Sequence, residues 1–534
     1  MDFDAIIIGS GHNGMICAAY LAQAGQRVAV FERREIVGGA VCTQEDLIPG
    51  YKIDVGSSAH IMIHQTPVLK ELGLERYGLE YIEMDPWGFY PIPGSSEGIF
   101  FYRDLEKTCA SIAAVSPRDA VAYRNFTHAW GELNEGVFTA FLKPPTPWNL
   151  ARSTFGRSLR GTDRINMVRK LMGPYGQLAN ETFESPHLRN AIIWLAAQSG
   201  PHPSEMASGD FVGWHSMYHQ SGMKRAKGGS GALTQALKRL IIDCGGSVFE
   251  NCPVHRIITD DQSGTVRGIE LQDHRTFAAP AVVAACHIKT TVETLLADAT
   301  LPNRIREGIQ HLRIGNGFGM IVRCATDGLP PYPQLQNYPA SESSPSPCHT
   351  GLQLLLPSNQ ALDEAYADFL RRRPPEKPVP LAMTFSAIDP TLAPPGKHTL
   401  FIWGQYHPYE LSNGEDWDAI AEREAAKLIE AVDAYAPGTR DLVTDQFIQT
   451  PLQIERMHGL HRGNVMHLEM SFDQMFLFRP IPELAAYRFP SHRGLYLTGS
   501  STHPGGGVWG ASGHNTAKLM LRERKKWRTP VPKA

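Results

Sequence analysis

The sequence predicts an α/β fold in which one parallel-sheet domain is assembled from three separated segments, with an α+β domain inserted between them. Blocks within 4–32, 225–260 and 495–515 each combine short apolar strands, clustered glycines and a helix, the pattern of strand-to-helix crossovers. The intervening stretches, 120–224 and 310–455, are richer in proline and aromatic residues. The chain is therefore expected to pass between the two domains four times.

Composition is that of an ordinary globular protein. The 534 residues carry a formal net charge of −3, and no lysine- or arginine-rich run interrupts the main body of the chain. A length prior of about 150 residues per domain predicts two or three folded units. We therefore expect no nucleic-acid partner.

The start of the chain and its cysteines favour a cytoplasmic location. MDFDAIIIG is acidic and leads directly into a strand, so it lacks the layout of a signal peptide. The apolar stretches are shorter than the roughly 20 residues that cross a bilayer as a helix. The eight cysteines show no close pairing, no zinc-like spacing and no CxxC motif.

The first glycine-rich turn lies in DAIIIGSGHNGMICAAYLA, where a buried strand at 5–8 precedes three glycines and a helix. Gly9 permits the tight turn, and Gly11 lets the backbone approach a diphosphate at the amino terminus of the helix. Gly14 lets the helix pack closely on the strand. These features predict a Rossmann-like, dinucleotide-binding domain.

The residues after the second strand, RVAVFE, distinguish between dinucleotides. Glu32 lies roughly 20 residues past the glycines, where a carboxylate accepts the ribose hydroxyls, and Arg33 beside it is also predicted to bind the cofactor. No arginine-rich pocket for a 2′-phosphate follows. The double glycine Gly38 and Gly39 instead resembles flavoproteins of the phytoene desaturase and amine oxidase superfamily, in which this segment runs beside the cofactor. The resemblance implies FAD.

The middle block, GGSGALTQALKRLIIDCGGSVFE, has glycines on both sides of a helix and a strand after it. In the same superfamily this block returns the chain to the first domain, and the backbone at the position of Val254 meets the adenine. TFAAPAVVAACHI then predicts another buried strand of the parallel sheet.

RGLYLTG predicts the last strand of the sheet, and GGGVWGASGHNTAKLML begins a helix whose N–H groups face the flavin end of the cofactor. The glycines leave room for a flat ring. The cofactor-binding residues predicted in this final turn are Gly499, Pro504, Gly505, Gly506, Gly507 and Gly510.

The resulting domain prediction alternates along the chain. The FAD-binding domain takes 1–119, 225–309 and 456–534, the last with a basic tail, and the substrate domain takes 120–224 and 310–455. Ligands usually sit in crevices between domains, so the substrate domain is expected to cap the flavin with an apolar tunnel. Its aromatic residues, Trp194, Phe211, Trp214 and Tyr218, are equally explained by core packing.

Two histidine pairs at helical spacing raise the question of a metal. HIMIH contains His60 and His64, and HSMYH contains His215 and His219. Neither forms part of a fuller ligand set, so no metal site is predicted. His60 is the candidate catalytic residue, because DVGSSAH is brought past the flavin by the resemblance and an imidazole there can steer water or a substrate end group.

No second glycine fingerprint follows a strand and opens a helix. RIGNGFGMIVRC is interpreted as a strand with small residues on one face. The flavin is therefore expected to be reoxidised by an acceptor such as oxygen or a quinone. The terminal RERKKWRTPVPKA places five cations and a tryptophan within eight residues, which suits either an anionic membrane surface, at about 1 kcal/mol per cation, or a frayed helix end.

Several longer motifs resemble the bacterial desaturase-type beta-carotene ketolases: DPWGF, SPRDA and MHLEMSFDQM are the more specific ones, and the resemblance runs along nearly the whole chain. Those ketolases are iron-independent flavoproteins that turn the C4 ring methylene of beta-carotene into a ketone, giving products of the echinenone and canthaxanthin type. The resemblance implies an apolar polyene substrate and peripheral contact with the membrane that holds it.

Three other functions stay open. A carotene desaturase or isomerase needs the same cofactor and tunnel. A non-catalytic lipid or isoprenoid carrier belongs to another class, but Glu32, the double glycine and the 505–510 turn have no use in a carrier. An amine oxidase would need an aromatic cage for the amine, which cannot be placed from the sequence.

Overall fold

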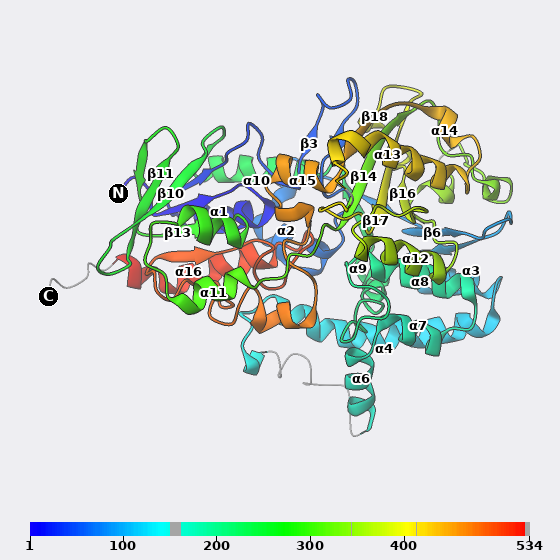
Figure 1. Ribbon diagram of the computed structural model, residues 1–534, viewed down its shortest axis with the longest axis horizontal. Helices are drawn as coiled ribbons and strands as arrows, with labels where there is room; N and C mark the ends of the chain where they lie inside the picture. Colours follow the sequence, from blue (N-terminus) through cyan, green and yellow to red (C-terminus); the bar gives the residue numbers. More distant parts are fainter. Residues whose placement is uncertain (150–161, 343, 413, 529–534) are drawn as a thin grey trace.

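The computed structural model describes residues 1–149, 162–342, 344–412 and 414–528. A five-stranded sheet forms the centre of the domain on the left of Figure 1. All of its neighbouring strands run parallel. In sheet order they are β19 (Leu495–Leu497), β13 (Val282–Ala284), β1 (Ala5–Ile8), β2 (Val28–Phe31) and β9 (Ser247–Phe249). This is the predicted discontinuous Rossmann-like arrangement.

Both faces of the parallel sheet are covered, as its uniformly apolar strands require. Ala5 and Ile7 of β1 belong to the core shared with three helices, α1 (His12–Gln23), α10 (Ala232–Asp243) and α16 (Ala511–Arg528). Ile6 and Ile8 point to the opposite face, because successive strand residues alternate between faces. That face packs on a three-stranded antiparallel sheet, β10 (Val254–Thr259), β11 (Val266–Leu271) and β12 (Thr276–Ala278), and on α11 (Asn303–Gln310).

The second domain is built on a seven-stranded mixed sheet. In sheet order its strands are β18 (Val443–Gln449), β14 (Gly319–Thr326), β17 (His398–Gln405), β16 (Pro380–Met383), β15 (Leu352–Leu354), β6 (Gly88–Pro91) and β7 (Gly98–Phe101). One face packs on α13 (Trp417–Asp433). The other packs on a layer of helices, among them α3 (Leu105–Ala113), α4 (Pro117–Phe141), α7 (Tyr175–Thr182), α8 (Pro186–Ala197) and α12 (Asn359–Leu370). The inserted domain is therefore α+β.

The first domain boundary differs from the predicted one at residue 119. β6 and β7 lie within 1–119, yet β6 pairs with β15 and both strands belong to the sheet of the second domain. The chain crosses earlier, at β5 (Tyr81–Met84), which pairs antiparallel with the returning strand β8 (Met223–Ala226). Composition did not reveal this, because GFYP and GIFF are apolar strands that would suit either sheet.

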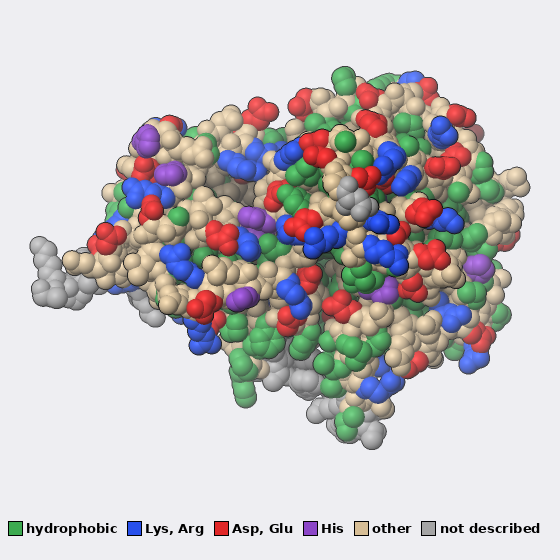
Figure 2. Space-filling model, in the orientation of Figure 1, with side chains coloured by type: hydrophobic (Ala, Val, Ile, Leu, Met, Phe, Trp, Pro, Cys, Tyr) green, Lys and Arg blue, Asp and Glu red, His purple; other side chains and the backbone are tan. Residues whose placement is uncertain are grey.

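The remaining elements are short: β3 (Thr43–Gln44), β4 (Ile53–Asp54), α2 (Val68–Leu72), α6 (Thr162–Met172), α9 (Tyr218–Ser221), α14 (Thr439–Leu442) and α15 (Pro451–His458). Within the described ranges, none of the helices has the length and apolar character to cross a membrane. Figure 2 shows acidic and basic side chains intermixed over most of one face. The predicted basic tail falls outside the described residues from 529 onward.

Candidate active site

A cavity of about 600 Å³ extends from the carboxyl end of the parallel sheet into the second domain. Residues that follow β1, β2 and β13 line one end, where nucleotide-binding folds hold their ligands. Ile321 of β14, Trp403 of β17 and Leu195 of α8 line the other end. The cavity therefore spans both domains.

The first glycine turn leaves open space beside the start of α1. Gly9 has a φ of +97°, which favours glycine. A Cβ on Gly14 would lie 2.5 Å from the Gly9 carbonyl oxygen, so helix and strand pack as closely as predicted. A Cβ on Gly11 would meet no atom within 4 Å, and α1 has no side-chain cap at its amino terminus. Uncapped N–H groups beside open space suit an anionic group.

Glu32 is buried at the end of β2 and lines the cavity. Its Oε2 accepts hydrogen bonds from the Ser10 backbone N–H at 2.9 Å and from the Ser10 hydroxyl at 2.5 Å. Its Oε1 accepts the backbone N–H of Arg34 at 3.0 Å. Arg33 and Val254 line the same end. Contact between Glu32 and a ribose stays a prediction.

The double glycine approaches the first turn closely. The Gly38 N–H donates to the Ser10 carbonyl at 3.1 Å. A Cβ on Gly39 would lie 3.3 Å from the Gly11 Cα. Both glycines have positive φ and both line the cavity, so this segment forms one wall of the space next to Gly11.

The final turn divides into residues that line the cavity and residues that support them. Gly499, Gly506 and Gly507 line it. A Cβ on Gly506 would lie 2.8 Å from the Met466 Cα, so this close approach requires glycine. Three other predicted residues are absent from the lining: Pro504, Gly505, which packs on Arg479, and Gly510, which packs on Ile16 of α1.

His60 lies outside the cavity lining and is fully buried. Its Nδ1 is 2.8 Å from the Tyr81 hydroxyl, and its Nε2 is 2.8 Å from the Ser230 hydroxyl. Burial lowers its pKa well below 6.5. With both ring nitrogens bonded to protein, His60 is placed as a structural residue, and we do not retain it as a catalytic candidate.

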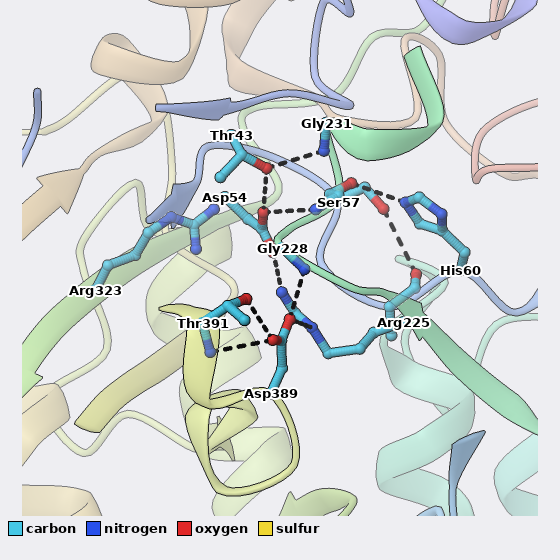
Figure 3. Close-up of polar contacts among 12 residues, drawn as sticks. Thr43, Asp54, Ser57, His60, Arg225, Gly228, Gly231, Arg323, Asp389 and Thr391 are labelled. Carbon is cyan, nitrogen blue, oxygen red and sulfur yellow. Dashed lines mark hydrogen bonds and ion pairs between the residues drawn. The ribbon is translucent and has the colours of Figure 1, made fainter. Parts of the chain in front are cut away.

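His60 borders a buried ionic cluster where the two domains meet (Figure 3). Asp54 binds Arg225 at 3.3 Å, and Asp389 lies 3.7 Å from the Arg225 Nε. Arg323 points toward Asp54 (Figure 3) and stacks on the Phe401 ring at 4.6 Å. All four of these charged side chains are buried, and two arginines balance two aspartates.

The end of the cavity in the second domain is an apolar chamber. Its residues include Leu195, Phe211, Trp214, Tyr218, Ile321, Trp403, Met466, Met470 and Trp509. Trp214 packs edge to face with Phe211 at 5.0 Å and with Trp509 at 6.2 Å. His215 also lines it, and burial lowers the pKa of His215 to about 3, so the ring is neutral at pH 7. Glu32, at the opposite end, is the only acidic residue among the described lining residues.

Several lining residues had no predicted role. Cys286 and His287 follow β13, a position that the carboxyl-end rule for parallel strands would have indicated. Met466, His467 and Met470 lie in the quoted motif MHLEMSFDQM, for which the sequence supplied a resemblance but no contact. In the part of the chain that the structure describes, no group of three or more His, Cys, Asp or Glu is arranged to hold a metal ion.

Comparisons with known proteins agree on the class of site. A family model described as flavin containing amine oxidoreductase matches residues 14–521. Pyridine nucleotide-disulfide oxidoreductase domain-containing protein 2 of Rattus norvegicus is 30% identical over 98% of this chain and 94% of its own length. One of the subunits of limonene dehydrogenase from Castellaniella defragrans is 28% identical, covering 97% and 94%. Lycopene-forming phytoene desaturase of Pantoea ananas is 26% identical, covering 97% and 99%.

Among solved structures, cyclohexylamine oxidase of Brevibacterium oxydans superposes with a TM-score of 0.56. The identity is 18%, covering 98% of this chain and 100% of that one. At this identity the likeness concerns the fold: a parallel Rossmann-like sheet with a mixed sheet in the second domain.

Proposed function

Because the chain belongs to the flavin containing amine oxidoreductase family, and is a flavin-dependent oxidoreductase that uses FAD, we propose that it oxidises the C4 ring methylene of beta-carotene to a ketone. The observation that carries the substrate class is the apolar chamber that continues from the glycine turns. The choice of reaction rests on the resemblance of DPWGF, SPRDA and MHLEMSFDQM to the ketolases.

The chamber suits a hydrocarbon because its walls offer aromatic and aliphatic surface and no carboxylate. Each apolar side chain covered by the substrate contributes roughly 25 cal/mol per Å² removed from water. A cationic amine would find no counter-charge there, because Glu32 lies at the other end of the cavity. This favours a polyene over an amine.

When bound, FAD supplies a two-electron acceptor for an allylic C–H bond. Conversion of CH₂ to C=O with oxygen from water removes four electrons, so two rounds of oxidation are needed. The chain's part is to orient the ring methylene, keep bulk water out and admit one water. Direct use of molecular oxygen is the competing source of the ketone oxygen. Oxygen or a quinone is proposed as the final electron acceptor.

Desaturation is the second candidate. Two similar proteins are named for dehydrogenation of isoprenoid hydrocarbons, phytoene in one and limonene in the other. Removal of two hydrogens needs the same cavity and no water. A carrier without catalysis is set aside, because the family is enzymatic and Gly11, Gly39 and Glu32 shape a cofactor cavity that a carrier does not need.

Contact with a membrane surface is part of the proposal, because a polyene is dissolved in lipid. Ile165, Val168 and Met172 of α6 are exposed at three- and four-residue spacing, and Met206 beside them is exposed too. Hydrophobic side chains are frequent along the lower edge of Figure 2, where α6 lies in Figure 1. An apolar helix face of this kind can rest on a bilayer.

The test expresses the chain in a host that accumulates beta-carotene and compares the masses and visible spectra of extracted pigments with an empty-vector control. The expected product has gained one oxygen and lost two hydrogens per reacted ring. In a parallel host that accumulates phytoene, the expected result is no change. Unchanged beta-carotene together with dehydrogenated phytoene would replace the ketolase by the desaturase.

Gly11→Trp is the matched inactive variant. The φ of −55° at Gly11 suits any residue, and its Cβ points into open space, so the indole fills the cavity without backbone strain. Gly11→Ala adds only a methyl group at the same position. We expect product formation to be lost with tryptophan and largely retained with alanine, measured at equal amounts of folded protein.

A further inference from the structure

The final turn rests on a buried arginine that has no acidic partner. Arg479 is fully buried, and it donates to the backbone carbonyls of Ser500 at 2.8 Å and Met466 at 2.6 Å. Its other hydrogen bonds also go to backbone carbonyls. No ion pair involves it among the described residues. Burial lowers the pKa of Arg479 to about 9, so it is cationic at pH 7.

An uncompensated buried cation is costly unless a negative charge comes close. Arg479 joins the Ser500 and Met466 carbonyls, and both of these residues line the cavity. The positive charge therefore lies directly behind this part of the wall.

His467 lies next to Met466 and lines the cavity. Its Nδ1 is 2.9 Å from the Ser501 hydroxyl, and its backbone carbonyl accepts the Nε2–H of His287 at 3.0 Å. The φ of His467 is +66°, an unusual conformation for a residue other than glycine. Such a conformation persists only where surrounding contacts hold it, and residues of this kind are often found at binding sites.

These contacts determine which nitrogen of His467 carries the proton. The Ser501 hydroxyl already accepts the backbone N–H of Ile288 at 3.1 Å. Its own proton has one acceptor among the described residues, the Nδ1 of His467. Because Nδ1 accepts, the neutral ring carries its proton on Nε2, and within the described chain Nε2–H has no hydrogen-bond partner.

Other donors face the same part of the cavity. His12, at the uncapped start of α1, lies close enough to lower the pKa of His467 electrostatically, and both rings line the cavity with Gly499 and Ser500. Among the described residues, no acidic side chain lines this part. We propose that His467 donates its Nε2–H to a diphosphate oxygen of FAD, with the charge of Arg479 behind it. The inference concerns the cofactor and is independent of which substrate the chamber takes.

The test measures the dissociation constants of FAD and ADP for apoprotein, by quenching of flavin fluorescence and by calorimetry. His467→Asn keeps an amide at the position of Nδ1, tolerates positive φ and has no atom at Nε2. His467→Gln places an amide N–H near the position of Nε2. We expect Asn to weaken both FAD and ADP at least ten-fold, as for loss of one charge-assisted hydrogen bond, and Gln to recover most of the affinity.

His461→Asn is the matched control. His461 stacks on the other side of His287 at 4.3 Å but does not line the cavity, so this variant is expected to bind both ligands like the wild type. Weaker FAD with unchanged ADP in His467→Asn would place the contact outside the diphosphate and overturn the proposal. Equal losses in the Asn and Gln variants, or a loss in His461→Asn, would show a structural effect and overturn it too.

Discussion

Buried arginines occur in two places near the cavity, and their charges are balanced differently. Where the domains meet, Arg225 and Arg323 lie beside Asp54 and Asp389, so the cluster is neutral within the protein (Figure 3). Beneath the final turn, Arg479 has only backbone carbonyls as partners. A cluster that supplies its own counter-charges joins parts of the fold, whereas an unpaired cation beside a cavity indicates where an anion binds.

The connectivity of the paired cluster agrees with a joining role. Asp54 accepts the Ser230 N–H at 2.8 Å and the Thr43 hydroxyl at 2.7 Å. Asp389, from the second domain, accepts the Gly228 N–H at 2.8 Å. Groups from separate stretches of the chain are therefore fixed to two buried carboxylates.

The largest expected effect comes from breaking the paired cluster. Asp389→Ala leaves the Arg225 charge with one partner and the Gly228 N–H without its acceptor, and we expect the free energy of unfolding to fall by about 3–5 kcal/mol. Urea unfolding followed by circular dichroism measures the change. Asp418→Ala is the control, because Asp418 forms an exposed ion pair with Arg456 and should cost less than about 1 kcal/mol. Equal losses would contradict the comparison.

Acid should act on the histidines near Arg479. Burial, with a smaller contribution from His461, lowers the pKa of His287 from 6.5 to about 3. The unfolded chain therefore takes up the proton first, and stability that is present above pH 6.5 is lost as the pH falls toward 3. Between pH 6.5 and 5 this residue should remove roughly 2 kcal/mol.

Urea midpoints of the apoprotein at neutral and mildly acidic pH test this expectation. His287→Gln should show a smaller drop than the wild type, whereas the exposed His311→Gln should match the wild type. An unaltered pH dependence in His287→Gln would mean that His287 does not titrate as described.

The smallest effect separates the two clusters most directly. Arg479→Met should reduce the stabilisation that saturating FAD confers by about 1–2 kcal/mol, as expected for charges roughly 8–16 Å apart at an effective dielectric constant of about 20. Asp389→Ala should lower the apo and FAD-bound midpoints equally. If Arg479→Met also affected both forms equally, its charge would serve the fold and not the ligand.

Much of the FAD-binding domain was predictable because its determinants are local. Gly9, Gly11 and Gly14 act through backbone geometry within one turn, and the structure gives each of them the predicted steric role. The apolar strands within 5–8, 282–284 and 495–497 indicated a sheet buried on both faces. The boundary at residue 119 differed, because strand pairing of β6 with β15 joins residues far apart in sequence.

The candidate site was predictable in its glycines and Glu32 but not in its polar side chains. His60 stood out because it lies in a segment beside the cofactor, yet its ring turns toward Tyr81 and Ser230. His467 carried no comparable signal. Its orientation depends on Ser501 and His287, which are distant in the sequence.

The sequence by itself determined the fold class, the cofactor and the two glycine turns, because a missing Cβ and an apolar strand have the same consequences wherever the chain runs. Only the tertiary structure decided which histidine faces the cavity and which arginine has no counter-charge. Both properties depend on what surrounds a side chain in three dimensions. Burial then makes an unmatched donor or charge a strong preference for a particular ligand.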